Sequence, residues 1–316
     1  MRFSSSLTSA MIAAAAIAAL AACSGTSSGA NAGTALPTVN DAAASATTAG
    51  SPTAIAYISD SIQNTVTAYA SNGKIKLRIA RNLKTPGGLL VDANHDLWVA
   101  NGDDDNVLVF AYGKTKPKRT LSAPGLAPTD VAICPNGTVF VAVDQGPLEV
   151  YSHGSLTPSR HMTYQGGAMG SVTCDAAGNV FATGVVNFRS AIVEFPKGMA
   201  KGASQLPITT LATPNGIRMA ADGKHLLIGD QSQYTITEFT ESGKPTGKQI
   251  ATTNGAACIT FGVATDGTIG CPVYFENPQG TTVGATFSFP AGTAGRTYAN
   301  PLFGQPYGFA FDSIPT

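Results

Sequence analysis

The stretch Pro86–Gly113 reads PGGLLVDANHDLWVANGDDDNVLVFAYG, and it decides the fold. Three short apolar runs, Leu89–Val91, Leu97–Ala100 and Val107–Phe110, are separated by turn-forming residues. Apolar runs of this length that are joined by short turns are typical of antiparallel strands. The stretch therefore predicts three consecutive strands of one antiparallel sheet.

The same pattern recurs along the chain about every 40 to 48 residues, a spacing that is typical of propeller blades. In most copies one apolar strand leads to an Asn-Gly, Ala-Gly or Asp-Gly turn, and a second strand follows. The copies begin at Pro86, Pro128, Met169, Pro214, Cys258 and Pro306. A repeat of this length with three or four strands per unit predicts a β-propeller.

The two ends of the repeat region complete the count of blades. Pro306–Asp312 matches a first strand, whereas Ala54–Ser59, Thr65–Tyr69 and Ile75–Ile79 match second, third and fourth strands. Pairing these segments in one blade would close the ring and leave no open inner edge. The sequence therefore predicts an all-β, six-bladed β-propeller over residues 53–316, and an open solenoid is the alternative.

The composition agrees with an all-β domain and argues against two kinds of partner. Only 12% of the residues are charged, and Gly (35) and Pro (19) are frequent, as expected for many turns and few helix surfaces. The formal net charge is zero, so no basic field exists that would attract nucleic acid or anionic lipid. We therefore expect neither as a partner of the folded domain.

Residues 1–22 predict a signal peptide, because Arg2 precedes an apolar run from Leu7 to Ala22. The end of this run, Leu20-Ala21-Ala22-Cys23, resembles the lipobox of bacterial lipoproteins. The resemblance implies that Cys23 is acylated and becomes the first residue, and Ser24 after it implies the outer membrane of the cell envelope. An ordinary secretory leader is the alternative.

Residues 23–52 are rich in Ser, Thr, Ala and Gly, with Asp41 as their only charge. Such a segment has too little apolar surface to offset the entropy of ordering, so it predicts a flexible tether between the anchor and the propeller.

The blades resemble NHL-repeat propellers, whose unit reads roughly P-x-G-[IV]-x-[VF]-D-x-x-G-x-[IVL]-[YWF]-[VA]-[AS]-[DN]. Pro86–Asn101, Pro128–Asp144 and Pro214–Asp230 follow this pattern well. The resemblance covers Ala54–Asp312 and implies the propeller fold. It does not select a function, because such propellers include binding modules, lactonases, lyases and scaffolds.

In a propeller, the starts of the first strands and the loops between second and third strands lie on one face, which we call the loop face. Polar side chains from these places form the candidate binding face, which consists of Asp103, Asp104, Asp105, Asp130, Asp144, Arg189, Asn215, Asp230, Glu276 and Tyr307. Convergent oxygen ligands suit Ca²⁺, so Asp130, Asn215 and Asp230 are weak candidates for a calcium site.

A structural alternative applies to the residues that recur at the ends of second strands. Asp60, Asn101, Asp144 and Asp230 would then accept backbone N–H bonds in their own loops. The Asp103–Asp105 run would be solvated or would share a cation. Because the loop Asn101–Asn106 belongs to one blade alone, it is the first place to look for specificity.

Pro214-Asn215-Gly216 resembles a motif of the gluconolactonase-type propellers, in which that Asn is a ligand of a catalytic divalent metal. The resemblance implies further acidic or amide ligands at the other first-strand starts. This chain has instead Gly87, Thr129, Gly170, Ile259 and Tyr307. No H-E-x-x-H motif is present, and no G-x-S-x-G nucleophile elbow lies in the propeller region, so no catalytic residue is assigned.

Four cysteines lie within the propeller region, and an even number in an exported domain permits two disulfides. Cys134 with Cys174 and Cys258 with Cys271 are the favoured pairs, and buried free thiols are the alternative.

The sequence as a whole favours a lipid-anchored, monomeric, extracytoplasmic binding module for a protein, peptide or glycan of the cell envelope. The competing hypothesis is a divalent-metal-dependent hydrolase or lactonase with a non-standard ligand set. The third hypothesis is a purely structural spacer in the cell envelope.

Overall fold

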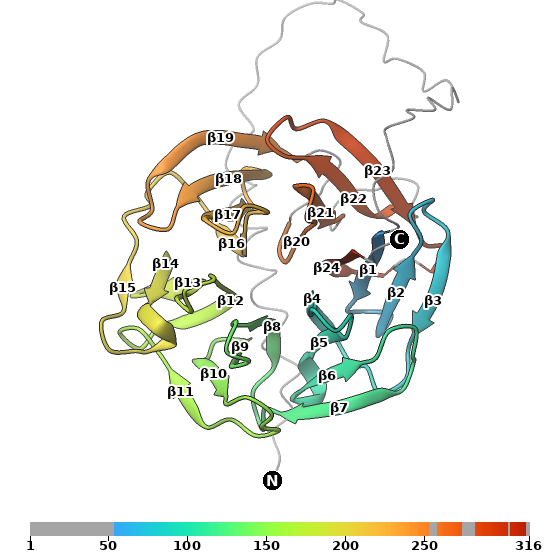
Figure 1. Cartoon of the computed structure of the whole chain (residues 1–316), viewed down its shortest axis with the longest axis horizontal. Coiled ribbons are helices and arrows are strands. Elements are labelled where there is room, and N and C mark those ends of the chain that lie inside the picture. Colours follow the sequence, from blue (N-terminus) through green and yellow to red (C-terminus); the bar gives the residue numbers. More distant parts are fainter. Residues whose placement is uncertain (1–53, 253–257, 274–281, 303, 314–316) are drawn as a thin grey trace, which may run out of the picture. The chain divides into compact units, whose positions relative to one another are not determined.

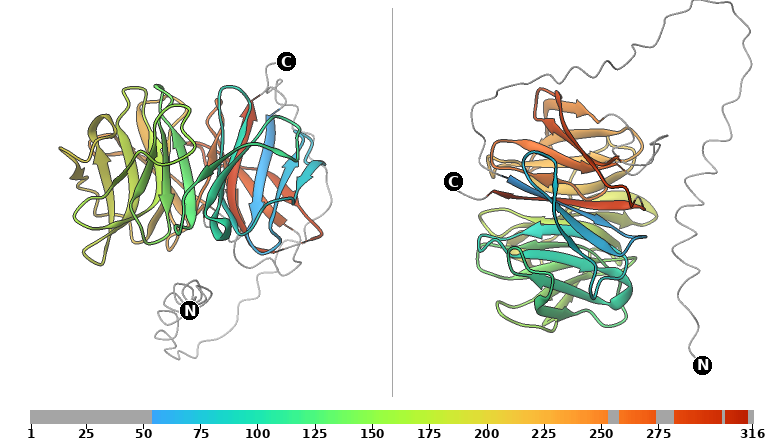
Figure 2. Two further views of the ribbon diagram at one scale, coloured as in Figure 1. Left: turned by 90° about the horizontal axis from the view of Figure 1, so that it is seen from below. Right: turned by 90° about the vertical axis from the view of Figure 1, so that its right-hand side faces the viewer.

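The computed structural model describes residues 54–252, 258–273, 282–302 and 304–313. The described chain forms a six-bladed β-propeller in which each blade is a four-stranded sheet (Figure 1). Seen edge-on, the ring is a disc whose thickness is crossed by the inner strands (Figure 2). The predicted fold class is therefore confirmed. Within the described residues, no helix has the length and apolar character needed to span a membrane.

The first three blades follow each other along the chain. Blade 1 contains β24 (Pro306–Ser313), β1 (Ala54–Asp60), β2 (Thr65–Tyr69) and β3 (Ile75–Ile79). Blade 2 contains β4 (Pro86–Val91), β5 (Leu97–Asn101), β6 (Asn106–Phe110) and β7 (Pro117–Ser122). Blade 3 contains β8 (Pro128–Ile133), β9 (Val139–Val143), β10 (Leu148–Tyr151) and β11 (Arg160–Met162).

The other three blades complete the ring. Blade 4 contains β12 (Ala168–Cys174), β13 (Val180–Val186), β14 (Arg189–Phe195) and β15 (Ser204–Gln205). Blade 5 contains β16 (Pro214–Met219), β17 (His225–Asp230), β18 (Thr235–Thr240) and β19 (Pro245–Ala251). Blade 6 contains β20 (Gly262–Val263), β21 (Thr268–Pro272), β22 (Thr282–Ser288) and β23 (Ala294–Ala299).

Blade 1 closes the ring with strands from both ends of the repeat region, as predicted. The C-terminal strand β24 is the innermost strand and pairs antiparallel with β1, for example Ala56 with Phe311 and Ile58 with Phe309. This pairing gives β1 a partner on its inner edge, so the ring has no open inner strand. The two ends of the repeat region are thereby held together by strand pairing, with one register shift between Ile58 and Asp60.

Burial within a blade falls from the centre outward, which explains the sequence pattern. The second strands β5 and β9 are buried at every position, because neighbouring blades cover both of their faces. The outer strand β19 is exposed at five of its seven positions. Third strands carry aromatic side chains that are fully buried between blades: Tyr69, Phe110, Tyr151, Phe195, Phe239 and Phe287.

The first strands approach one another so closely that some positions accept only glycine. A Cβ atom on Gly88 would lie 2.4 Å from Asp130 Oδ1, and one on Gly308 would lie 2.4 Å from the carbonyl oxygen of Gly87. These distances are far below van der Waals contact. Gly88 and Gly308 are therefore explained by close packing between first strands around the channel.

Two disulfides join the pairs that the sequence favoured. Cys134 and Cys174 link blades 3 and 4 with a Cα–Cα distance of 5.4 Å, and Cys258 and Cys271 link two segments of blade 6 at 4.8 Å. Blade 6 otherwise departs from the repeat, because its first strand is reduced to Gly262–Val263. Thr260 instead forms a parallel bridge to Gly308 of blade 1.

Candidate functional site

Three of the four recurring polar residues at the ends of second strands bind the connection that enters their own blade. Asp230 accepts hydrogen bonds from the backbone N–H groups of Ala212, Thr213, Ser232 and Gln233. Asp60 accepts from Gln63 and Gln305, and Asn101 accepts from Lys84. Asp144 differs, because its side chain is exposed and makes no hydrogen bond to the described residues. Asp60, Asn101 and Asp230 therefore stabilise the backbone around the loops in which they lie.

The acidic run in blade 2 does not converge on one point. Lys84 Nζ lies 2.6 Å from Asp104 Oδ1, the Thr85 hydroxyl donates to Asp103, and the Gly125 N–H donates to Asp105. The hydrogen bond to Asp104 raises the pKa of the Lys84 ammonium. Each carboxylate therefore has a partner on a different segment. The loop is held to the connections that enter blades 2 and 3.

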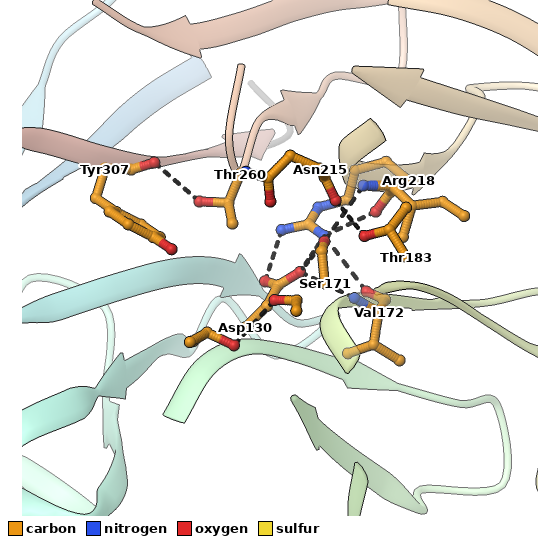
Figure 3. Close-up of polar contacts among 11 residues, drawn as sticks. Asp130, Ser171, Val172, Thr183, Asn215, Arg218, Thr260 and Tyr307 are labelled. Atoms are coloured by element: carbon orange, nitrogen blue, oxygen red, sulfur yellow. Dashed lines mark hydrogen bonds and ion pairs between the residues drawn. The ribbon is translucent and has the colours of Figure 1, made fainter. Parts of the chain in front are cut away.

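The centre of the ring contains a buried ion pair (Figure 3). Arg218 on β16 donates from Nη1 to Asp130 Oδ2 at 2.7 Å and from Nη2 to Asp130 Oδ1 at 2.8 Å. The Ser171 hydroxyl donates to Asp130 Oδ2 at 2.5 Å, and the Val172 N–H donates to the same oxygen at 3.2 Å. Asp130 is completely buried. Its carboxylate therefore has four donors from blades 4 and 5.

Sequence reasoning missed Arg218. The position lies inside the strand PNGIRM, whose neighbouring residues Ile217 and Met219 are apolar. A charged residue at the middle of an inner propeller strand faces the channel, where an isolated charge would be costly. That position was the available signal, and it required a buried acidic partner such as Asp130.

Asn215 and Tyr307 lie at the starts of their strands and are tied to neighbouring blades through their backbone oxygens (Figure 3). The carbonyl oxygen of Asn215 accepts from the Thr183 hydroxyl, and that of Tyr307 accepts from the Thr260 hydroxyl at 3.0 Å. The Asn215 side chain donates to Gln231.

The three weak metal candidates, Asp130, Asn215 and Asp230, thus have three separate sets of partners. Within the described residues, no group of three or more His, Cys, Asp or Glu side chains is arranged to hold a metal ion. Glu276 and Cys23 lie outside the described residues.

The hairpin of blade 4 carries the most exposed large apolar side chain among the described residues, Phe188. β13 and β14 pair as far as Val186 with Arg189, so Asn187 and Phe188 form a two-residue turn. Both turn residues have positive φ angles, 51° and 61°. Phe188 is fully exposed (102%), Val185 is half exposed (50%), and Arg189 is exposed beside them. Arg189 is the only residue of the sequence-predicted binding face in this turn region.

These features define the class of protein as a closed six-bladed β-propeller with an ion pair at the centre of the ring. No protein-family model matches the chain, and no curated protein matches it.

Solved structures that resemble the chain share its fold at low sequence identity. A chain of a nidogen/laminin complex is 12% identical with a TM-score of 0.67, and the match covers 83% of this chain and 98% of that one. A protein of unknown function from Bacteroides caccae is 11% identical with a TM-score of 0.62, covering 83% and 99%. A calcium-binding regucalcin from Agrobacterium tumefaciens is 15% identical with a TM-score of 0.53, covering 71% and 77%. At these identities the likeness concerns the fold alone.

Proposed function

We propose that this chain is a lipid-anchored binding module of a bacterial cell envelope, and that its loop face engages a protein or peptide partner through the β13–β14 hairpin tip. The observation that carries the proposal is Phe188. A fully exposed phenylalanine in a left-handed backbone conformation serves neither the core nor the turn. We call Val185, Phe188 and Arg189 the hairpin tip.

The conformation of Phe188 has an energetic cost. A side chain in the left-handed region costs about 1–2 kcal/mol relative to the right-handed one, and two-residue hairpin turns of this kind favour Asn-Gly. Asn187 fits that preference and Phe188 does not. Local strain of this sort is concentrated at functional sites, where the rest of the structure maintains it.

The chemistry of the hairpin tip suits a protein surface. Aromatic residues and arginine are enriched among the residues that dominate binding energy in protein interfaces. Phe188 and Arg189 are adjacent and exposed, and Val185 adds apolar area on the same hairpin. A partner with an apolar pocket beside an acidic group would complement both residues.

The competing metal-dependent hydrolase needs carboxylates that converge on a cation. Asp130 is neutralised by Arg218, and Asp230 is occupied by four backbone N–H groups. Apart from the exposed Asp144, the described carboxylates of the loop face are therefore engaged in structural contacts, and the hydrolase hypothesis has no converging ligand set among them.

The location of the module rests on the sequence. Cys23 in its lipobox-like context and the polar residues 23–52 support an anchored domain on a tether. A flexible tether of this length has a root-mean-square span of about 30 Å, so the loop face could meet partners away from the membrane.

The test compares two forms of the full-length chain in the cell envelope, each with a photo-crosslinking residue at one position. With the crosslinker at position 188 we expect one discrete adduct, and at position 112, on the opposite edge of the ring, we expect none. Phe188→Ser should weaken binding of the isolated partner by about thirtyfold, and Tyr112→Ser, which removes another exposed aromatic, should leave it unchanged. No adduct at 188, or chelator-sensitive hydrolysis of lactones by the purified chain, would contradict the proposal. An adduct sensitive to glycosidases would instead identify a glycan.

A further inference from the structure

The central channel contains a cavity of about 220 Å³ that is not part of the loop face. Its lining residues all lie on first strands, and every one of the six blades contributes: β4, β8, β12, β16, β20 and β24. They occupy the later positions of these strands, such as Leu89–Val91 and Phe309–Phe311. The cavity therefore lies toward the edge of the ring that is opposite the loop face.

The floor of the cavity is polar. Arg218 lines it, and the Asp130 carboxylate that holds Arg218 lies earlier on β8, on the strand-start side. All hydrogen bonds of Arg218 run through Nη1 and Nη2, so its Nε–H donor is not used by the described residues. Thr173 on β12 also lines the cavity, and its hydroxyl has no hydrogen-bond partner among the described residues. Two residues on adjacent blades thus each bring an unused donor to the same cavity.

The side chains at the walls and the mouth of the cavity are mostly apolar, and the cavity surface as a whole is of mixed polarity. Leu90, Ala132 and Ala310 line its walls, and the last strand positions form a rim of partly exposed residues. The rim consists of Val91, Ile133, Cys174, Met219, Val263 and Phe311. Because each rim residue is partly exposed, the cavity opens to solvent at this edge. An apolar pocket with a few directed polar groups is the usual form of a small-molecule site.

We propose that this cavity binds a neutral molecule of about one ring in size that carries an acceptor oxygen, such as an aromatic ketone, ester or amide. The size follows from the volume, because an apolar protein cavity of about 150 Å³ is large enough for benzene. The acceptor oxygen follows from the unused Arg218 Nε–H and the Thr173 hydroxyl. The ring would contact Leu90, Met219 and Phe311.

The neutrality of the ligand follows from the charge already present. Arg218 is balanced by Asp130 through two short hydrogen bonds in a buried setting. A second carboxylate at the floor would place two anions against one cation at low local dielectric, which is unfavourable. The cavity should therefore discriminate against carboxylates, although it contains an arginine.

The test uses three probes of similar size on the full-length chain: acetophenone, toluene and benzoate. Isothermal titration calorimetry should show that acetophenone binds about tenfold more tightly than toluene, which lacks the acceptor, and more tightly than benzoate, which adds a charge. Thr173→Val should weaken the binding of acetophenone several-fold without affecting the binding of toluene. The methyl NMR signal of Met219, assigned with Met219→Leu, should shift on binding.

A filled cavity supplies the control. Ala310→Leu should abolish binding of acetophenone, whereas Ala176→Leu, at an exposed turn on the same edge, should leave it intact. Should Ala310→Leu not fold, Ala132→Leu fills the cavity from another blade. The proposal is overturned if acetophenone does not bind to the wild-type chain, if it binds equally to the filled variant, or if benzoate binds as tightly as acetophenone.

Discussion

Arg218 and Asp130 are 88 residues apart in the chain, yet their side chains meet at the centre of the ring through two hydrogen bonds of 2.7 and 2.8 Å. Arg218 belongs to blade 5 and Asp130 to blade 3, so the pair spans the blade between them. Blade 4 contributes Ser171, whose hydroxyl donates to Asp130 and accepts the N–H of Ile217. Three blades are thereby joined by one buried polar network.

The network predicts a strong asymmetry between single and double variants. Asp130→Asn leaves the Arg218 charge buried without its anion, and we expect a loss of about 3–5 kcal/mol in the free energy of unfolding. The double variant Asp130→Leu/Arg218→Met removes both charges and should lose much less. Urea unfolding of Asp130→Leu, of Arg218→Met and of the double variant forms the double-mutant cycle. A loss in the double variant equal to the sum of the two single losses would show that the charges are not coupled.

The loop-capping carboxylates predict a contrast between Asp230, which pairs with the first-strand residue Pro214, and Asp144, which lies one residue beyond the equivalent position in blade 3. Asp230→Ala removes the acceptor of four backbone N–H groups, so it should lower the free energy of unfolding by about 2 kcal/mol. Asp144→Ala alters an exposed side chain without such contacts, so it should change the free energy of unfolding by less than about 0.5 kcal/mol. Thermal and urea denaturation measure both. Similar losses in the two variants would argue against the capping role.

The hairpin tip predicts a variant that gains stability while it loses function. Phe188→Gly relieves the left-handed conformation and should raise the free energy of unfolding by about 1 kcal/mol. The same substitution removes the exposed aromatic ring and should weaken binding of the partner proposed above. A stabilised variant that retains full binding would separate the strain of Phe188 from any role in recognition.

The two disulfides predict unequal losses of stability, because they close loops of different length. Cys134 and Cys174 are separated by 40 residues, and Cys258 and Cys271 by 13. In the chain-entropy description the longer loop contributes about 4 kcal/mol and the shorter about 3 kcal/mol. Denaturation of the two paired Cys→Ala variants should therefore show the larger loss for Cys134/Cys174. The reverse order would mean that native packing, and not loop closure, sets the difference.

His95 predicts a dependence of stability on pH. Its ring donates to Asp312 at 2.6 Å, and the hydrogen bond and charge of Asp312 raise the pKa of His95 above 6.5. Because the folded state binds the proton more tightly, the contribution is complete below the unfolded-state pKa and is lost as pH rises through the folded-state pKa. The melting temperature should fall from about pH 6 to pH 8 more steeply in the wild type than in His95→Gln. An NMR titration that places the His95 pKa at or below 6.5 would contradict this.

The blades and their closure could be predicted because they depend on short-range patterns. Apolar runs separated by turn residues locate strands, and the repeat of Pro86–Gly113 along the chain shows where each blade begins. The lone C-terminal strand and the three N-terminal strands complement each other in number, and the register of β24 with β1 confirms that reading. Blade 6 was harder to predict, because Thr260 bridges to Gly308 and leaves its first strand only two residues long.

The candidate site was only partly predictable, because it depends on where side chains point and what they meet. Asp130 was visible as a polar residue at a strand start, but its partner Arg218 lay in a strand that otherwise reads as apolar. The exposure of Phe188 could not be predicted either, since buried aromatic residues occupy third strands throughout the chain. Its place in the turn follows from the pairing of Val186 with Arg189.

The sequence by itself thus determined the number of blades, the closing strand and the favoured cysteine pairs, since local turn chemistry and repeat spacing decide them. Only the tertiary structure decided which polar groups are free to act. Closing the ring brings first strands from all six blades together, so side chains that are far apart in the chain come into contact. In the folded ring, Asp130 is paired with Arg218, and the Asp230 carboxylate accepts backbone N–H groups such as that of Ala212. Phe188 remains exposed to solvent.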